Sequence, residues 1–369
     1  MERAYLPDAG PYATVIALAR SGTPAALATV VAADGSAPQV PGASAVFTAA
    51  GLAGGTVGGG VGEARVERAA RRAIAAGASR LISLGLDYDP SFESEAICGG
   101  KLRVLIDARP ERHIPVFLKM MADVRRRTAG ALVTWIGAAS RGRGAEVRRF
   151  WRRAGARAPL SGGRSFPPSL RGAIRSIGRP ASPELSEGSG GALYVEPHAP
   201  APRLIIAGAG HVGRAAAHLG RFLNFDVTVI DDRPEFANAD RFPGAARIVV
   251  ADPARALKRL PLGPEAYVVI VTRGHRGDEG ALRACIRRRA AYIGMIGSAR
   301  KVRLLRERFL SRGWCSAADW DRVKTPIGLP IGSRTVEEIA VSIAAELVAA
   351  RSGNGRASGT GSSALRSGR

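Results

Sequence analysis

The sequence predicts an α/β protein in which a glycine-rich N-terminal α/β domain precedes a Rossmann-like domain with a doubly wound parallel sheet. The chain has 369 residues, more than a single hydrophobic core usually serves. Two glycine-rich turns each lead into a helical pattern, and strands alternate with helices beyond residue 203, as in a parallel sheet. The predicted division is 1–138 for the N-terminal domain, 139–200 for an insertion or linker, 201–350 for the Rossmann-like domain and 351–369 for a tail.

The N-terminal domain is predicted from short apolar runs separated by turn-forming residues. A helix, two strands, a glycine-rich turn, a second helix and two more strands are expected in this order: 12–20, 27–31, 46–48, 54–62, 63–76, 81–84 and 102–106. The order indicates a compact α/β unit.

The segment 139–200 and the tail differ in composition from both domains. The segment is rich in Arg, Gly, Ser and Pro, which favours a loop insertion or an interdomain linker. The tail is Gly-, Ser- and Arg-rich low-complexity sequence with too little apolar surface to pack, so we expect it to be disordered.

The C-terminal domain contains unbroken Val- and Ile-rich runs, the pattern of strands that helices cover on both faces. These runs are 204–207, 227–230, 248–250, 267–271 and 292–296. The last helix begins after Thr335, and Glu338 stands three residues later. This spacing predicts a capping box, in which the Glu338 side chain bonds back to the cap.

A glycine motif, Gly208-Ala-Gly210-His-Val-Gly213, lies between the first of these strands and a helix. Gly208 permits the tight turn, Gly210 lets backbone amides approach a phosphate, and Gly213 lets the helix lie close to the sheet. The helix N-terminus adds free N–H groups and a partial positive charge. An acid is expected about 20 residues later, and Asp231 and Asp232 stand there. The motif predicts a Rossmann turn, and the bound ligand can be a nucleotide or another phosphorylated molecule.

Two histidines and another acid also follow strands of this sheet. His211 lies inside the glycine turn, and His275 and Asp278 follow the fourth strand. Because the carboxyl ends of parallel strands meet at one edge, these side chains and Asp231 can share a crevice. The alternative is that each polar group only caps a turn or a helix, as Asp278 is placed to do at a helix start.

The glycine-rich turn of the N-terminal domain also precedes a helix, a geometry suited to phosphate. Its residues nearest the helix are Gly58, Gly59, Gly60 and Glu63. Taken by itself, the run is equally consistent with a flexible turn. Cys98, followed by Gly99 and Gly100, is either a reactive thiol or a buried small apolar residue.

Charge and cysteine content restrict the function classes. The net charge of +23 comes mainly from arginine spread along the whole chain, without the motifs of RNA readers or zinc fingers. This argues against nucleic acid as the main partner and for anionic small molecules or an acidic protein. The three cysteines, Cys98, Cys285 and Cys315, form no disulfide framework. With no signal peptide and no apolar run of about 20 residues, we expect a cytoplasmic protein without a membrane contact.

Four stretches are together far more specific than any single motif. They are Gly35-Ser-Ala-Pro-Gln-Val-Pro-Gly42, Gly54 through Glu63, Cys98-Gly-Gly100, and the Rossmann half with 231–237, 292–298, Lys301 and 326–332. Through them the chain resembles the XdhC/CoxI family, accessory proteins for xanthine dehydrogenase and related molybdenum hydroxylases. The resemblance covers roughly residues 12–107 and 203–350.

The resemblance implies a cofactor-binding chaperone rather than an enzyme. Such a protein binds molybdenum cofactor (molybdopterin), protects it during sulfuration and passes it to a xanthine-dehydrogenase-type apoenzyme. The partners implied are that hydroxylase, a cysteine desulfurase and a second copy of the chain. By the same resemblance, the turn up to Glu63 and Cys98 line the cofactor site, Cys98 contacts molybdenum, and the Rossmann crevice is a second anion site.

The chain departs from the family pattern at two places. Val61 and Gly62 stand where the family usually has a cysteine and an aliphatic residue before Glu63, which leaves Cys98 as the remaining motif cysteine. Thr272-Arg-Gly-His275 replaces the usual Thr-His-Asp-His. A role that needs both histidines is therefore not expected here.

The alternative function is an NAD(P)-dependent oxidoreductase that uses the Rossmann glycines and Asp231, with Arg233 placed to accept the 2′-phosphate of NADP. Against it, the sequence has no evident hydride-acceptor site with a paired general acid. The hydroxylase itself is a poorer candidate, because two iron–sulfur clusters need more cysteine ligands than three.

Overall fold

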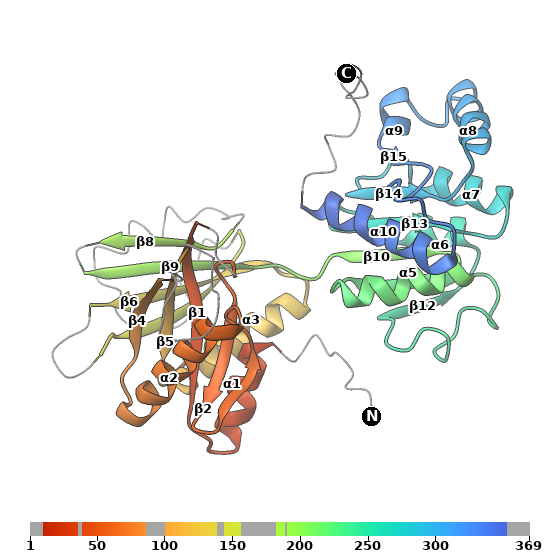
Figure 1. Ribbon diagram of the computed structural model, residues 1–369. Coiled ribbons are helices and arrows are strands. Elements are labelled where there is room, and N and C mark those ends of the chain that lie inside the picture. The colour runs from red at the N-terminus through yellow and green to blue at the C-terminus, as the bar shows by residue number, and fades with distance from the viewer. Residues whose placement is uncertain are drawn as a thin grey trace, which may run out of the picture. The chain divides into compact units, whose positions relative to one another are not determined.

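The computed structural model describes residues 10–35, 39–85, 100–138, 144–155, 182–188 and 190–352. The chain divides into two compact units, Met1–Pro200 and Ala201–Arg369 (Figure 1).

The first unit is built on a five-stranded antiparallel sheet with the order β3-β2-β1-β5-β4. Its strands are β1 (Ala25–Asp34), β2 (Ser44–Thr48), β3 (Gly51–Gly55), β4 (Arg80–Gly85) and β5 (Lys101–Asp107). The helices are α1 (Pro11–Arg20), α2 (Gly60–Ala76) and α3 (Ile114–Arg125), and the short 3₁₀ helix η1 (Pro110–His113) precedes α3.

Alternate residues of β1 enter different cores, as the two-residue period of a strand requires. Ala26, Ala28 and Val30 pack with the apolar face of α2. Leu27 packs on the other face with residues of α1 and α3. The sheet therefore holds the start of α2, and the glycine turn before it, against a buried core.

A second, four-stranded antiparallel sheet in this unit has the order β7-β6-β9-β8. Its strands are β6 (Gly130–Gly137), β7 (Val147–Arg153), β8 (Glu184–Gly188) and β9 (Gly191–His198). Three of them lie within 139–200, so the described parts of this segment are sheet and not the predicted insertion or linker. The physical reason lies in β7, where Phe150 and Trp151 enter different cores and Arg149 is buried.

The second unit contains a six-stranded parallel sheet with the order β12-β11-β10-β13-β14-β15. The strands are β10 (Arg203–Ala207), β11 (Asp226–Asp231), β12 (Arg247–Val250), β13 (Ala266–Ile270), β14 (Tyr292–Met295) and β15 (Val323–Lys324). This is the doubly wound Rossmann order, which reverses direction between β10 and β13. The predicted fold class is confirmed, and the five predicted strands agree with β10–β14 to within a residue at each end.

Helices cover both faces of this parallel sheet (Figure 1). The helices are α5 (His211–Phe222), α6 (Pro253–Arg259), α7 (His275–Cys285), α8 (Ala299–Ser311), α9 (Ala317–Asp321) and α10 (Val336–Arg351). Leu204 and Ile206 of β10 pack with α5 and α10, whereas Ile205 and Ala207 pack with α6, α7 and α8. Residues on both faces of the strand are buried, which explains the unbroken apolar runs in the sequence.

The predicted capping box at the start of α10 is confirmed. The Glu338 amide donates to Thr335 Oγ1 at 3.2 Å, and the Thr335 amide donates to Glu338 Oε2 at 3.0 Å. Most of the predicted tail lies outside the described residues. None of the helices in the described ranges combines the length and apolar character needed to cross a bilayer.

Candidate functional site

The three glycines of the Rossmann turn are glycine for different reasons. Gly208 has φ +119°, and a Cβ there would lie 2.3 Å from the Val271 carbonyl oxygen. A Cβ on Gly213 would lie 1.9 Å from the Gly208 carbonyl oxygen. The fold itself therefore requires glycine at both positions. Gly210 has φ −67° and ψ −168°, which any residue adopts, and a Cβ there meets nothing within 4 Å.

Gly210 is the N-cap of α5, and no side chain caps this helix. Its carbonyl accepts the Arg214 amide at 2.9 Å. In the described part of the chain, no acceptor bonds the amides of His211 and Val212, which lie before that first helical bond. His211 is the exposed first residue of the helix. The turn thus leaves both space and unpaired N–H donors at the positive end of α5.

Asp231, at the end of β11, binds the turn instead of facing solvent. The buried carboxylate accepts the Ala209 amide at 2.8 Å and the Arg233 amide at 3.1 Å. The Arg233 guanidinium donates two more hydrogen bonds, at 2.9 and 3.1 Å. Burial alone would raise the pKa of Asp231, but these hydrogen bonds outweigh it and lower the pKa to about 2.

The two adjacent acids therefore have different environments. A carboxylate has about four acceptor positions, and the four hydrogen bonds to Asp231 fill them. The Asp232 side chain is 62% exposed and lies 4.0 Å from Arg233 Nε. Arg233 also lies over the Phe236 ring, 3.7 Å from its centroid. Asp232 is thus the acid of this pair that remains accessible to a ligand.

The loop after β13 places its histidine and its acid in opposite environments. His275 is the exposed first residue of α7, whose N-cap is Gly274. Asp278 is buried, four residues into the helix, so it is not the helix cap that the sequence suggested. Its carboxylate accepts from the Thr272 amide at 3.0 Å and the Thr272 hydroxyl at 2.7 Å, and it pairs with Lys301.

Lys301 connects two of the loops at this edge of the sheet. Its ammonium group donates to Asp278 and, at 3.1 Å, to the Ile296 carbonyl oxygen that follows β14. Both Asp231 and Asp278 thus fix loops at the carboxyl edge of the sheet, while His211 and His275 stand exposed at helix starts. The described residues contain no group of three or more His, Cys, Asp or Glu side chains arranged to hold a metal ion.

The glycine turn of the first unit also leaves open space at a helix start, because its residues adopt backbone conformations that favour glycine. Gly58, Gly59 and Gly60 have φ +129°, +71° and +57°, which favour glycine. Gly59 is the N-cap of α2, with ψ −179°. A Cβ on Gly59 or Gly60 would meet nothing within 4 Å. The turn is therefore open on the side toward which a side chain would project.

Glu63 holds this turn in place. Its Oε2 accepts from the Thr56 hydroxyl at 2.7 Å and from the Val57 amide at 3.0 Å. The predicted site residues Gly58–Gly60 and Glu63 thus lie together at the start of α2. Gly100 is buried directly before β5. Cys98 and Gly99, with the predicted molybdenum contact, lie outside the described residues.

Sequence reasoning assigns no site role to two residues that fix loops at the carboxyl edge of the sheet, Arg241 and Lys301. Arg241 donates to the Ala209 carbonyl oxygen at 3.3 Å and to that of Phe236 at 3.2 Å. Lys301 is named among the residues that carry the family resemblance, but the resemblance gives it no role at the site. Neither stands at a fixed spacing from the glycine motif, so only the folded structure reveals their contacts.

Fold and site together define a Rossmann-domain protein whose glycine turn offers unpaired helix amides, preceded by a unit with its own glycine turn. A family model described as the XdhC Rossmann domain matches residues 204–347, and one described as the XdhC and CoxI family matches residues 18–85. The two matches together cover more than half of the chain. The chain belongs to the XdhC and CoxI family.

Two curated relatives are similar over part of their length. A protein of Escherichia coli K12 named "Uncharacterized protein YqeB" is 34% identical over 162 residues, which are 43% of this chain and 29% of the relative. A Bacillus subtilis 168 protein, named as a probable xanthine dehydrogenase subunit, is 31% identical over 159 residues, 43% of this chain and 46% of the relative. The chain thus matches less than half the length of each.

One solved structure is similar over nearly the whole chain. It is a crystal structure of a xanthine dehydrogenase from Bacillus halodurans, with a TM-score of 0.77 and 23% sequence identity. The match covers 95% of this chain and 98% of that one. At this identity the likeness establishes the common fold.

Proposed function

We propose that this protein binds molybdenum cofactor (molybdopterin) and delivers it to the apoenzyme of a xanthine-dehydrogenase-type molybdenum hydroxylase. Membership of the XdhC and CoxI family supports the connection to xanthine dehydrogenase. So does the name of the Bacillus subtilis relative, which describes a probable component of that enzyme. The cysteine desulfurase and the homodimer remain predictions about further partners.

The observation that carries the proposal is the glycine at position 210. Its backbone conformation suits any residue, and a Cβ would touch no protein atom within 4 Å. Protein packing therefore gives no reason for glycine there, whereas an anion approaching the amides of His211 and Val212 does. The terminal phosphate of molybdopterin is an anion of that kind.

The first unit offers a second backbone cradle that also fits a phosphoryl group. Gly59 and Gly60 leave open space at the positive end of α2, and Glu63 fixes the loop that precedes them. The family resemblance assigns the pterin to this unit. We therefore propose that Gly58–Gly60 bind the cofactor and that the Rossmann turn binds a phosphoryl group.

The chain's own contribution is binding and shielding. When bound, the cofactor carries the molybdenum centre that the client hydroxylase requires. Glycine amides hold the anionic end without using a titratable group, and Glu63 keeps the turn in one conformation. By the resemblance, Cys98 contacts the metal. A carrier needs to release what it holds, and a site built from neutral amides suits reversible binding.

The contacts of Asp231 weaken the oxidoreductase alternative in the form that uses this acid, while the adjacent Asp232 stays exposed. The acid that follows the second strand of a dinucleotide-binding Rossmann domain accepts the ribose hydroxyls. Here the acceptor positions of Asp231 are filled by Ala209 and Arg233. Arg233, the residue considered for an NADP phosphate, is held by Asp231 and Phe236.

The test is activation of a purified, cofactor-free hydroxylase of the xanthine dehydrogenase type. The protein should be isolated from a molybdenum-replete host, and ligands released from it should be identified by mass spectrometry. We expect molybdopterin in the released material and faster activation of the apoenzyme than with free cofactor. Protein that carries no pterin and gives no faster activation would refute the proposal.

A further inference from the structure

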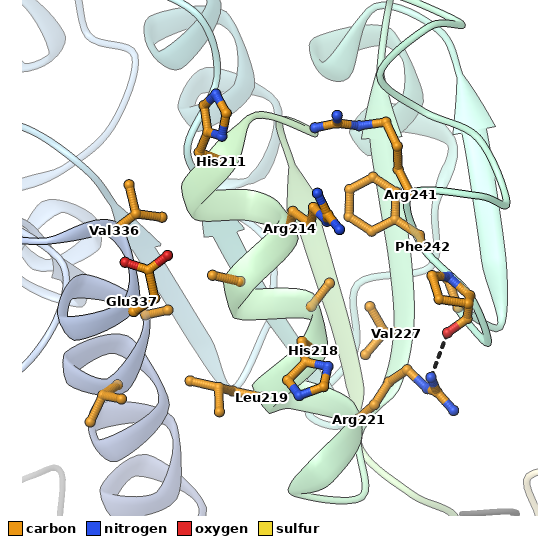
Figure 2. A pocket seen from close by; sticks show the side chains of 16 residues that line it. His211, Arg214, His218, Leu219, Arg221, Val227, Arg241, Phe242, Val336 and Glu337 are labelled. Atoms are coloured by element: carbon orange, nitrogen blue, oxygen red, sulfur yellow. Dashed lines mark hydrogen bonds between the residues drawn. The ribbon is translucent and has the colours of Figure 1, made fainter. Parts of the chain in front are cut away.

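A groove with a volume of about 640 Å³ runs along the outer face of α5. On one side it is bounded by α10, and on the other by the turn at residues 241–245 (Figure 2). His211, Arg214, His218 and Arg221 stand on α5 at spacings of three and four residues, so they share one helix face. Figure 2 shows Arg241 reaching toward the same groove from the opposite wall.

The positive charge in this groove is not neutralised by carboxylates. Arg221 donates to the Pro243 carbonyl oxygen, and Arg241 donates to the carbonyl oxygens of Phe236 and Ala209. In the ranges that the structure describes, the Arg214 side chain has no hydrogen bond or ion pair, and none of these three arginines pairs with an acid. Among the described residues that line the groove, Glu337 of α10 is the one acid.

Three other arginines of the same unit are paired with acids. Arg233 pairs with Asp231, Arg203 with Glu265 and Arg308 with Glu279. Three guanidinium groups that line one groove beside a single carboxylate give it a net positive charge, which favours a bound anion. The three arginines of the groove thus lack the carboxylate partners that Arg233, Arg203 and Arg308 have.

The geometry points to a binding site in this groove for a small molecule that carries a di- or triphosphate group. The planar, five-donor guanidinium matches phosphate oxygens, and Arg214 is free to make such contacts. The volume lies in the range of about 300 to 1,000 Å³ typical of small-molecule sites. Apolar side chains such as Leu219 and Phe242 line the same groove and can contact an attached ring.

This site adjoins the Rossmann turn of the proposed function, because His211, whose amide we assign to a phosphoryl group, also lines the groove. Gly210 is not among the residues that line the groove. Arg241 connects the two places through its hydrogen bond to the Ala209 carbonyl oxygen. A ligand in the groove would therefore lie against the outer side of the turn whose amides we assign to a phosphoryl group.

The experiment is calorimetric titration of the full-length protein with inorganic tripolyphosphate in about 0.15 M salt, where long-range charge effects are screened. We expect saturable binding that Arg214→Ala weakens by about tenfold or more, the size of one lost charge-assisted contact. Arg214→Lys should retain part of the affinity, because lysine keeps the positive charge but lacks the planar set of N–H donors of the guanidinium group. Titration with ADP then measures whether an attached ring adds affinity.

The matched control is Arg303→Ala on α8, an exposed arginine whose removal changes the net charge equally. Unchanged binding in this variant supports the groove, whereas equal weakening in both variants means diffuse attraction and overturns it. Binding kept in Arg214→Ala but lost in Gly210→Ala assigns the anion to the Rossmann turn and overturns it too. Tighter binding of an acidic peptide than of tripolyphosphate would make the groove a protein-docking surface, contrary to the inference.

Discussion

Both glycine turns leave open space at the start of a helix, but the physical reasons for glycine differ between the two turns. In the Rossmann turn, Gly208 and Gly213 are required by close backbone contacts, while Gly210 has an ordinary conformation beside open space. In the N-terminal turn, Gly59 and Gly60 need glycine for their positive φ and also face open space. Both turns end at a helix start with no side-chain cap.

This difference shows, for a single glycine, whether protein packing or a bound ligand explains the residue. A glycine that a Cβ would bring into contact with backbone is explained by packing. Gly210 has no such explanation, so it is the most informative position of the glycine motif. At the N-terminal turn, positive φ already explains the glycines, and open space for an anion is present as well. Only a control variant with equal backbone strain can separate these two explanations.

The largest effect on stability is expected for Gly213→Ala. The new methyl group would lie 1.9 Å from the Gly208 carbonyl oxygen, so helix and strand must move apart. We expect a loss of about 3 kcal/mol or more in the free energy of unfolding. Urea denaturation of the full chain measures it, and a loss below that of Gly210→Ala would contradict the packing argument.

A smaller loss, about 2 kcal/mol, is expected for Asp231→Asn, because the amide cannot replace the charged acceptor of the Arg233 and Ala209 bonds. The pKa of Asp231 is about 2 in the folded protein and 3.8 ordinarily. The contribution of the ionised Asp231 to the free energy of unfolding is therefore present above about pH 4, and it is lost as the pH falls from there toward 2. Stability curves of wild type and variant should converge over this interval, and a constant difference would contradict the assignment.

Gly59→Ala should destabilise the first unit by an amount on the order of 1 kcal/mol, through backbone strain at φ +71°. Gly22→Ala is the matched control, since Gly22 has φ +70° and its Cβ also meets nothing within 4 Å. We expect similar shifts in thermal unfolding from both changes, with loss of pterin retention only in Gly59→Ala. Loss of retention in both would assign the effect to strain.

The smallest effect on stability is expected for Gly210→Ala, within about 0.5 kcal/mol of wild type. The methyl group projects into the space before α5 and obstructs an anion there. Unchanged unfolding together with weaker ligand binding supports the account. A large destabilisation would mean that packing does explain this glycine.

Sequence patterns are sufficient for β10–β14 of the Rossmann half, because these strands are Val- and Ile-rich runs and each glycine role follows from strand-to-helix geometry, but they miss the two-residue strand β15. They fail for β7, where Val147-Arg-Arg-Phe-Trp-Arg-Arg153 resembles a solvated, charged segment. Arg149 is buried there because it pairs with Asp107 of β5, 42 positions away. A tertiary ion pair of this kind leaves no local pattern.

The candidate site is predicted only in part for the same reason. Spacing places Gly208, Gly210 and the acid pair correctly at the turn. It cannot distinguish the buried Asp231 from the exposed Asp232, because that depends on which side chain Arg233 binds. The basic face of α5 is visible as the spacing of its histidines and arginines, but the opposite wall of the groove comes from the distant Arg241.

Central to the proposed function is that each glycine turn, by itself, binds an anionic group of the cofactor through backbone amides. The most direct measurement is the dissociation constant of anaerobically prepared molybdopterin for wild type, Gly59→Ala, Gly210→Ala and Gly22→Ala. We expect binding to wild type and Gly22→Ala with equal affinity, and weakening of about tenfold or more in the other two. Equal affinity in all four proteins, or none in wild type, would contradict the claim.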